Sequence, residues 1–238
     1  MKLDILALMA HPDDAELSIG GILAKHKRLG YKTGIIDYTR GELGTRGTPE
    51  IRLSEATESA NILGLDVREN MSFRDGFFKD DEEHQLQVIQ KLRCFKPNIV
   101  LINAPQDRHP DHAKAAQLSL NSCFLSGLKR IETSLQGQAQ ESWRPRHVYH
   151  IIQSRHLTPD FIVDVSEDWD TKMASIGAFK SQFFNPSSTE PGTFISSPEF
   201  MEMIVGRSAD FGQSIGARYG EGLIKANPIG VKDLFDLH

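Results

Sequence analysis

Two short motifs in this chain combine histidine with aspartate. The first is Ala-His-Pro-Asp-Asp (residues 10–14) and the second is His-Pro-Asp-His (residues 109–112). In each motif a histidine and a second polar residue are three positions apart, so a first helical turn would place both on one face. Two neutral imidazoles and one carboxylate are a common ligand set for a hydrolytic zinc ion that keeps a position open for water. The spacing therefore indicates metal-assisted hydrolysis.

Further polar groups in the motifs could serve as a base, an acid and a stabiliser of negative charge. Asp13 lies beside the first motif's possible ligands, and His109 and Asp111 belong to the second motif. Either motif alone is most simply a turn with solvated side chains. Their occurrence together, each after an apolar run, favours one shared site.

The elements that must position these residues follow from the hydrophobic pattern and the Gly and Pro positions. Strands are expected at residues 3–9, 32–39, 67–73, 98–103, 146–153 and 160–165, and helices at 15–29, 49–63, 82–95, 110–125, 167–182 and 198–216. This alternation predicts an α/β fold, a Rossmann-like three-layer sandwich with a mostly parallel sheet, in a single domain over residues 1–238. The carboxyl ends of parallel strands meet at one crevice, which would bring the two motifs together. Residues 129–145 are expected to form a loop or a lid.

The loop after the second expected strand should face the same crevice. It carries Arg40 and Arg46, with Arg52 close behind, and these cations could hold an anionic or hydroxyl-rich substrate. The alternative is that Arg40 and Arg46 are solvated or in salt bridges. Arg52 could equally pair with Glu55 and stabilise its helix.

Composition narrows the class of protein. A formal net charge of −5 over 238 residues argues against nucleic-acid binding as the main activity. We find no apolar run long enough to span a membrane and no signal peptide, and we expect a cytoplasmic protein. Cys94 and Cys123 lie in no metal-binding spacing, so both are expected to be reduced thiols.

The motifs resemble those of the LmbE-like (PIG-L) family of zinc de-N-acetylases. The resemblance covers AHPDDAE (10–16), GTRGTPEIRLSE (44–55) and HPDH (109–112). It implies a Rossmann-like fold and removal of acetyl groups from N-acetylglucosamine-type sugars. It implies that His11, Asp14 and His112 are the zinc ligands and that Asp13 is the general base. It also implies that His109 stabilises the oxyanion or protonates the amine, that Asp111 orients His109, and that Arg52 binds the substrate. The cofactor would be Zn²⁺, with another divalent metal such as Fe²⁺ as an alternative.

Within the family, the start AHPDDAEL, the segment GELGTRGTPEIRLSEA and the late segment ARYGEGL are most similar to the bacillithiol biosynthesis deacetylases. The resemblance implies N-acetylglucosaminyl malate as the small-molecule substrate, a cytoplasmic location and a homo-oligomer, either a hexamer or a trimer. A dicarboxylate such as malate would explain an arginine-bearing loop. Tyr219 and Glu221 could belong to the site wall or to a subunit contact.

Other functions remain open at this point. The same chemistry could act on a different N-acetylglucosamine derivative, such as a GlcNAc-inositol or a chitooligosaccharide. A non-catalytic sugar-binding or metal-binding protein is a further alternative, although such a site does not need Asp13 and His109. A nucleotide-binding module is disfavoured, because the first strand leads into His-Pro-Asp-Asp rather than a glycine-rich loop. A two-metal phosphoesterase would need more carboxylates.

Overall fold

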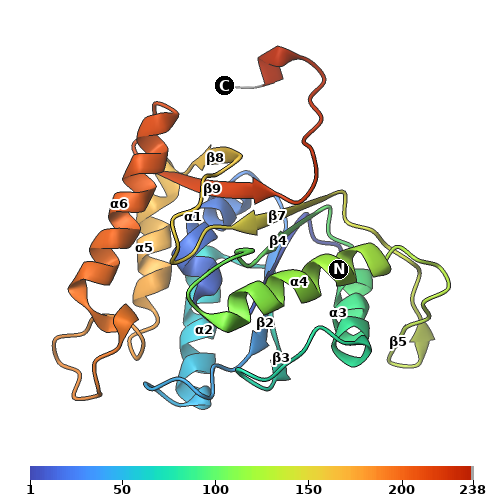
Figure 1. The fold of residues 1–238 in the computed structure, drawn as a ribbon, viewed down its shortest axis with the longest axis horizontal. Coiled ribbons are helices and arrows are strands. Elements are labelled where there is room, and N and C mark those ends of the chain that lie inside the picture. The colour runs from blue at the N-terminus through green and yellow to red at the C-terminus, as the bar shows by residue number, and fades with distance from the viewer. Residues whose placement is uncertain (237–238) are drawn as a thin grey trace.

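A seven-stranded sheet runs through the protein in the computed structural model, which describes residues 1–236 (Figure 1). The strand order is β3-β2-β1-β4-β7-β9-β8. The strands are β1 (Ile5–Met9), β2 (Thr33–Thr39), β3 (Val67–Phe73), β4 (Ile99–Ile102), β7 (His147–Ile151), β8 (Phe161–Asp164) and β9 (Gly220–Lys225). The strands from β3 to β7 in this order are parallel, and β9 is antiparallel to both of its neighbours. The predicted mostly parallel sheet is confirmed.

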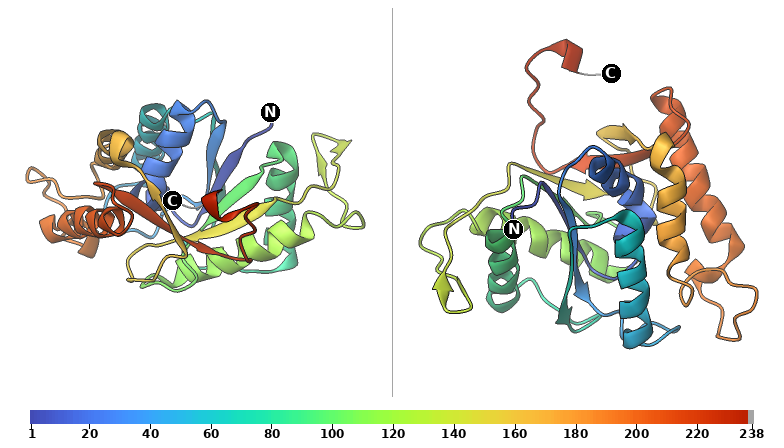
Figure 2. Two further views of the ribbon diagram at one scale, coloured as in Figure 1. Left: turned by 90° about the horizontal axis from the view of Figure 1, so that it is seen from above. Right: turned by 180° about the vertical axis from the view of Figure 1, so that it is seen from behind.

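Helices cover both faces of the sheet (Figure 2). They are α1 (Asp14–Arg28), α2 (Pro49–Leu63), α3 (Glu82–Phe95), α4 (Pro110–Leu125), α5 (Trp169–Gly177) and α6 (Pro198–Ser214). Successive side chains of β1 point to opposite faces, as they do in any strand. Leu6 and Leu8 pack with α3 and α4, whereas Ile5, Ala7 and Met9 pack with α1. The result is the predicted three-layer sandwich, and α2, α5 and α6 share a further apolar cluster on the α1 side.

The chain reverses its direction of travel across the sheet at β1. From β1 it passes through α1 to β2 and then to β3 on one side, and it returns to place β4 on the other side of β1. Ligands of open α/β sheets bind at such a switch point, outside the carboxyl ends of the strands. Both sequence motifs follow the two strands that flank this point.

Two elements differ from the prediction. The helix expected at 167–182 is a 3₁₀ turn (Ser166–Asp168) followed by α5, which ends at Gly177. After the helix, Ser181 donates its main-chain N–H and its hydroxyl to the carboxylate of Glu55, which ties this part of the chain to α2. Strand β9 was not predicted, since its short glycine-containing sequence becomes a strand only through pairing with the distant β7 and β8.

Residues 129–145 contain a small hairpin of β5 (Ser134–Leu135) and β6 (Gln138–Ala139). This segment lies against α3, where the buried Arg93 donates to the carbonyl of Ile131 and to the hydroxyl of Thr133. Gln140 also donates to a carbonyl of α3, that of Gln90. The segment predicted as a loop or a lid thus contains a short hairpin, and Arg93 holds it against α3.

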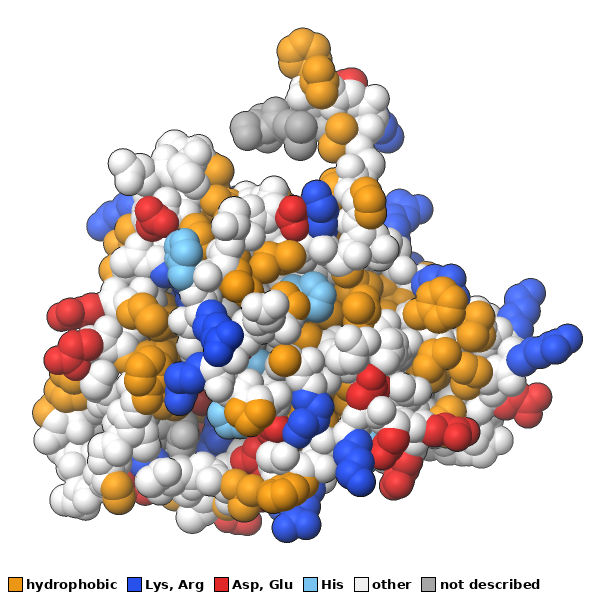
Figure 3. Space-filling model, in the orientation of Figure 1, with side chains coloured by type: hydrophobic (Ala, Val, Ile, Leu, Met, Phe, Trp, Pro, Cys, Tyr) orange, Lys and Arg blue, Asp and Glu red, His pale blue; other side chains and the backbone are white. Residues whose placement is uncertain are grey.

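The described residues contain no helix that combines the length and the apolar character needed to cross a membrane. Cys94 and Cys123 are free thiols, as predicted. The C-terminal segment projects from the body as an arm, and it carries hydrophobic side chains (Figure 3). Leu234 and Phe235 of this arm are exposed. Exposed apolar groups of this kind are common at contacts with other molecules, and the expected homo-oligomer stays a prediction. Residues 237 and 238 of the predicted domain lie outside the described residues.

A buried acid divides α1 into two parts. Ile19 has non-helical dihedral angles of φ −139° and ψ 16°. Beyond it, the N–H groups of Gly21 and Ile22 donate to the carboxylate of Glu221 at 3.0 and 2.6 Å. Lys172 neutralises this carboxylate at 2.6 Å, with both side chains about 1% exposed. Glu221 is thus a structural residue of the α1 layer, and Tyr219 stacks on Trp169. Neither residue lines the large cavity described below.

Replacing this acid should destabilise the fold strongly. Glu221→Gln leaves the Lys172 ammonium buried without a counter-charge, a change that costs about 3–5 kcal/mol in comparable buried pairs. Chemical denaturation should measure this loss as a lower free energy of unfolding. The matched control is Glu58→Gln, which removes the partner of Lys180 in an exposed pair and should leave the free energy almost unchanged. Equal effects of the two substitutions would contradict the structural role of Glu221.

Candidate active site

The first motif forms the turn between β1 and α1. His11, Asp13 and Asp14 are all buried there, at most 8% exposed. Asp13 is the N-cap residue of α1 and has φ 115° and ψ −24°, a conformation that non-glycine residues rarely adopt. Strain of this kind costs on the order of 1–3 kcal/mol and is concentrated at functional sites. The direction of the Asp13 side chain is thus set by a strained backbone conformation.

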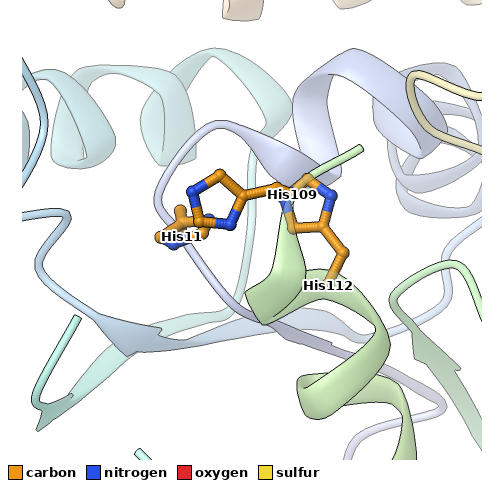
Figure 4. Close-up of side chains that lie close together, drawn as sticks. All are labelled: His11, His109 and His112. Carbon is orange, nitrogen blue, oxygen red and sulfur yellow. The ribbon is translucent and has the colours of Figure 1, made fainter. Parts of the chain in front are cut away.

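The second motif begins α4, beyond the end of β4. His109 is the N-cap residue, Pro110 occupies the first helical turn, and His112 follows within that turn. Figure 4 shows the rings of His11, His109 and His112 side by side. Their centroids are 4.7 Å apart for His11 and His109, 5.2 Å for His109 and His112, and 5.5 Å for His11 and His112. The structure therefore brings the two motifs into one site.

Asp14 lies at the centre of this group. One carboxylate oxygen is 3.1 Å from His112 Nε2, and the other is 3.7 Å from His11 Nδ1. The same oxygens accept hydrogen bonds of 2.9 Å from the side-chain amides of Gln153 and Asn103. Asp14 thus lies between the two imidazoles, with one oxygen toward each. Among the described residues, two groups have their possible ligand atoms within 4.8 Å of one another: His11 with His109 and His112, and His11 with Asp75 and Asp111. Imidazole and carboxylate groups gathered in this way could hold a divalent metal, and the predicted ligand set of His11, Asp14 and His112 stays a prediction.

A second carboxylate supports each of the two imidazoles from behind. His11 Nε2 is 3.0 Å from Asp75 Oδ1, and His112 Nδ1 is 2.5 Å from Asp107 Oδ2. Metal-ligating histidines commonly pass their other ring N–H to such an acceptor, which fixes the ring and strengthens it as a ligand. Asp75 was not predicted from the sequence. The one available signal was its position in the loop after β3, another strand that ends at this edge of the sheet.

The electrostatics of the cluster favour a bound cation. Burial alone would lower the pKa of His11, but hydrogen bonds with Asp111 and Asp75 outweigh it and raise the pKa to about 10. Burial also opposes protonation of His112, whose pKa rises to about 9 through Asp14 and Asp107. Although burial favours the neutral acid, His112 and His11 hold the pKa of Asp14 well below its usual range. The site is thus negative enough to keep two protons that a metal ion could replace.

Metal binding should therefore release protons. A pH of 7–8 is below the raised pKa values of His11 and His112, so both imidazoles should carry a proton in the metal-free protein. Metal ligation requires the neutral rings. Zinc should displace about two protons per ion, and its apparent affinity should rise steeply with pH in this range. Calorimetry of zinc binding in buffers of different ionisation enthalpy counts these protons. Binding without proton release would contradict this assignment of ligands.

The acid behind His112 offers a second test of the metal site. Asp107→Asn should weaken zinc binding by roughly 10- to 100-fold, the range found for comparable supporting groups, while all three proposed ligands remain. Competition with a chelator measures this affinity. Asp160→Asn is the matched control, because Asp160 is exposed and pairs with Lys225 away from the site. An unchanged affinity in Asp107→Asn would exclude a supporting role for this carboxylate.

The predicted base is paired with the predicted substrate-binding arginine. Asp13 Oδ2 lies 3.1 Å from Arg52 Nη2, which also donates to the carbonyl of Pro12 at 2.6 Å. Arg52 reaches this place because Gly41 has no side chain, and a Cβ atom there would lie 1.6 Å from the guanidinium. Burial raises the pKa of Asp13 to about 7, and Arg52 partly opposes this rise. The structure thus pairs Arg52 with Asp13, while Glu55 accepts from Ser181 instead.

Asp111 and His109 are linked differently from the expected arrangement. The Asp111 carboxylate accepts from the main-chain N–H of Gly76 and from Lys114, both at 2.8 Å, and lies 3.4 Å from His11 Nε2. Its main-chain N–H donates to His109 Nδ1 at 3.3 Å. The orientation that Asp111 gives to His109 in this structure therefore comes through the backbone. Burial and the nearby cationic His11 and His112 lower the pKa of His109.

A cavity of about 490 Å³ opens over these groups, a size suited to a small-molecule ligand. Four arginines line it: Arg46, Arg52, Arg108 and Arg207. Arg207 was not singled out from the sequence, because it lies in α6, far from both motifs. Arg40 is exposed and lines a smaller, separate cavity. Apolar side chains from the 194–204 region form another wall, and no residue of 129–145 lines this cavity, so that segment does not act as a lid in this structure.

Comparison with known proteins places these observations in a family. Residues 6–123, which contain both motifs, match the sequence model of the PIG-L family, described as GlcNAc-PI de-N-acetylase. The chain belongs to the PIG-L family. The resemblance inferred from the motifs is thereby confirmed.

The conserved protein TT1542 from Thermus thermophilus has a crystal structure that matches this chain along almost its full length. The two are 35% identical, with a TM-score of 0.86 and coverage of 98% of each chain. Two curated relatives are more distant. Diacetylchitobiose deacetylase from Thermococcus kodakarensis is 27% identical over 75% of this chain and 70% of its own. A probable N-acetyl-alpha-D-glucosaminyl L-malate deacetylase 2 from Bacillus subtilis is 21% identical over 76% of this chain and 84% of its own. A 4-oxalmesaconate hydratase from Pseudomonas putida also matches, so similarity of sequence alone does not determine the reaction.

Proposed function

We propose that this protein is a metal-dependent N-acetylglucosaminyl deacetylase, an amide hydrolase that uses zinc. One observation carries the proposal. The buried Asp13 lies immediately beside the His11, Asp14 and His112 set, and all four residues line one cavity. A site that only bound metal or sugar would not need a strained, buried carboxylate next to the ligands. Relatives named as deacetylases support the same reaction class.

Amide hydrolysis needs an activated water, a stabilised oxyanion and a proton for the leaving amine. A bound zinc ion would lower the pKa of water and polarise the amide carbonyl. Asp13 would accept the proton of the attacking water, and its pKa of about 7 suits a base that works near neutral pH. Arg52 would hold the Asp13 carboxylate in place and compensate its charge.

His109 would face the substrate from the opposite motif. Its ring stands 4.7 Å from that of His11 and lines the cavity. The main-chain N–H of Asp111 donates to Nδ1, which leaves Nε2 as the atom that can carry a proton toward the amide. His109 would therefore stabilise the oxyanion or protonate the departing amine, with Asp111 as the residue that positions it.

We propose N-acetylglucosaminyl malate, an intermediate of bacillithiol biosynthesis, as the substrate. The cavity presents arginine side chains around the metal-binding residues, and Arg46 and Arg207 come from elements outside both motifs. A dicarboxylate aglycone provides partners for such cations. The alternative substrate is another N-acetylglucosamine derivative, such as a GlcNAc-inositol or a chitooligosaccharide. A cytoplasmic homo-oligomer fits this role and is part of the proposal.

Substitution of the base and of a ligand should separate catalysis from metal binding. Asp13→Ala should keep zinc and lose turnover by a factor of at least about 10², the lower range for a general base. His11→Ala should lose both zinc and turnover. Acetate release from N-acetylglucosaminyl malate and from N-acetylglucosamine measures activity, and metal analysis measures zinc. Chelation followed by zinc return is the control for the metal.

The outcomes of this experiment discriminate between the alternatives. Fast zinc-dependent release from the malate conjugate alone supports the proposed substrate. Release from other acetylated sugars instead would support the alternative substrates. Near-normal turnover in Asp13→Ala would show that Asp13 is not the base, and zinc binding without acetate release from any of these sugars would favour a binding protein.

A further inference from the structure

Arg46 is a buried cation in the wall of the cavity. It lies in the loop after β2 and is 4% exposed. Its Nη2 donates to Ser188 Oγ at 2.5 Å, whereas its buried Nε has no hydrogen-bond partner among the described residues. The guanidinium therefore makes fewer hydrogen bonds than it can, and a more closely placed carboxylate would satisfy Nε. Its loop is held firmly, because Gln182 donates to the carbonyl of Arg46 at 2.8 Å.

The carboxylate of Glu190 occupies the place next to this guanidinium. Glu190 Oε2 lies 3.5 Å from Arg46 Nε, and Glu190 Oε1 accepts from the main-chain N–H of Gly47 at 2.9 Å. We call Arg46 together with the Gly47 N–H the Arg46 receptor. Gly47 has φ +69°, and a Cβ atom at this position would lie 2.7 Å from Ser181 Oγ. The receptor is therefore a fixed pair of donors that suits a carboxylate.

The occupant is far less fixed than the receptor. The Glu190 side chain is 42% exposed and belongs to residues 184–193, a connection between α5 and α6 whose side chains are mostly exposed. Water reaches the exposed carboxylate of Glu190, so another carboxylate can take its place beside Arg46 without leaving the buried guanidinium uncompensated. Beyond this connection, Phe194 and Ile195 line the same cavity as Arg46. Release of Glu190 would thus free the receptor, while the hydrogen bond from Arg46 to Ser188 would still hold the connection.

We propose that the Arg46 receptor binds a carboxylate of the substrate, and that Glu190 is an internal competitor that occupies the receptor until substrate displaces it. This inference rests on the proposed function in that the incoming carboxylate belongs to the aglycone. An occupant of matching chemistry is already present, in contact with both donors. When a competitor occupies the receptor in part of the molecules, the apparent affinity for the ligand equals the intrinsic affinity multiplied by the fraction of molecules whose receptor is open.

Binding of malate to the full, zinc-loaded chain tests the proposal without turnover. Calorimetry should give a Kd for L-malate that is roughly three- to tenfold lower in Glu190→Gln than in the wild-type protein, because the competitor has lost its charge. The neutral probe L-malamide should show no such gain. Arg46→Gln should lose most of the malate affinity. Glu202→Gln is the matched control, since Glu202 is an exposed acid of α6 and does not line the cavity.

Two results would overturn the inference. An unchanged or weaker malate affinity in Glu190→Gln would mean that Glu190 is a structural tie. Equal malate affinity in the wild-type protein and Arg46→Gln would mean that malate binds elsewhere, for example on the metal. If Arg46→Gln does not fold, the comparison of Glu190→Gln with wild-type protein decides alone. A lack of acetate release from every sugar would count against the proposed deacetylase and would leave this binding test valid.

Discussion

The carboxylate of Asp14 is the interaction on which the site depends, because it joins segments that the chain order keeps far apart. Its two oxygens face His11 and His112 and accept from Asn103 and Gln153. These partners come from the ends of β1, β4 and β7 and from the start of α4. A buried carboxylate needs charged or hydrogen-bonding partners on each side, since burial without them is costly. The adjacent ends of these parallel strands supply the partners at one point.

The same requirement explains why the site contains more acids than a metal ion needs as ligands. Asp75 and Asp107 stand behind the two imidazoles and select which ring nitrogen faces Asp14. Asp13 stands apart from them, because its strained backbone directs it to Arg52. Acids that support ligands and an acid that can move a proton are thus kept in separate environments. The pKa shifts follow this division. Although burial opposes it, hydrogen bonds with His11 and His112 lower the pKa values of Asp75 and Asp107, whereas burial raises the pKa of Asp13.

The sequence was most informative where chemistry and strand order coincide. His11 and His112 could be placed together because each follows an apolar strand, and parallel strands present their carboxyl ends at one edge. Asp75 and Arg207 could not be found in this way. Asp75 is a single acid in a loop, and Arg207 enters the cavity from α6, whose position is set by packing of its apolar face against α2 and α5. Strand β9 was not predicted for a related reason, because it pairs only with strands that are distant in the sequence.

The groups proposed for the chemistry and those proposed for ligand recognition differ in how deeply they are buried. The groups proposed for metal binding and proton transfer lie at strand ends and at the first turns of α1 and α4, where the buried layers fix them. The opposite side of the cavity includes Phe194 and Ile195, which follow the exposed 184–193 connection. That connection is joined to the buried side through Ser188 and Glu190, which contact Arg46 and Gly47. Substitutions in this connection would therefore act on the proposed ligand-binding wall and leave the proposed reacting groups in place, because binding groups on loops can change while the scaffold stays the same.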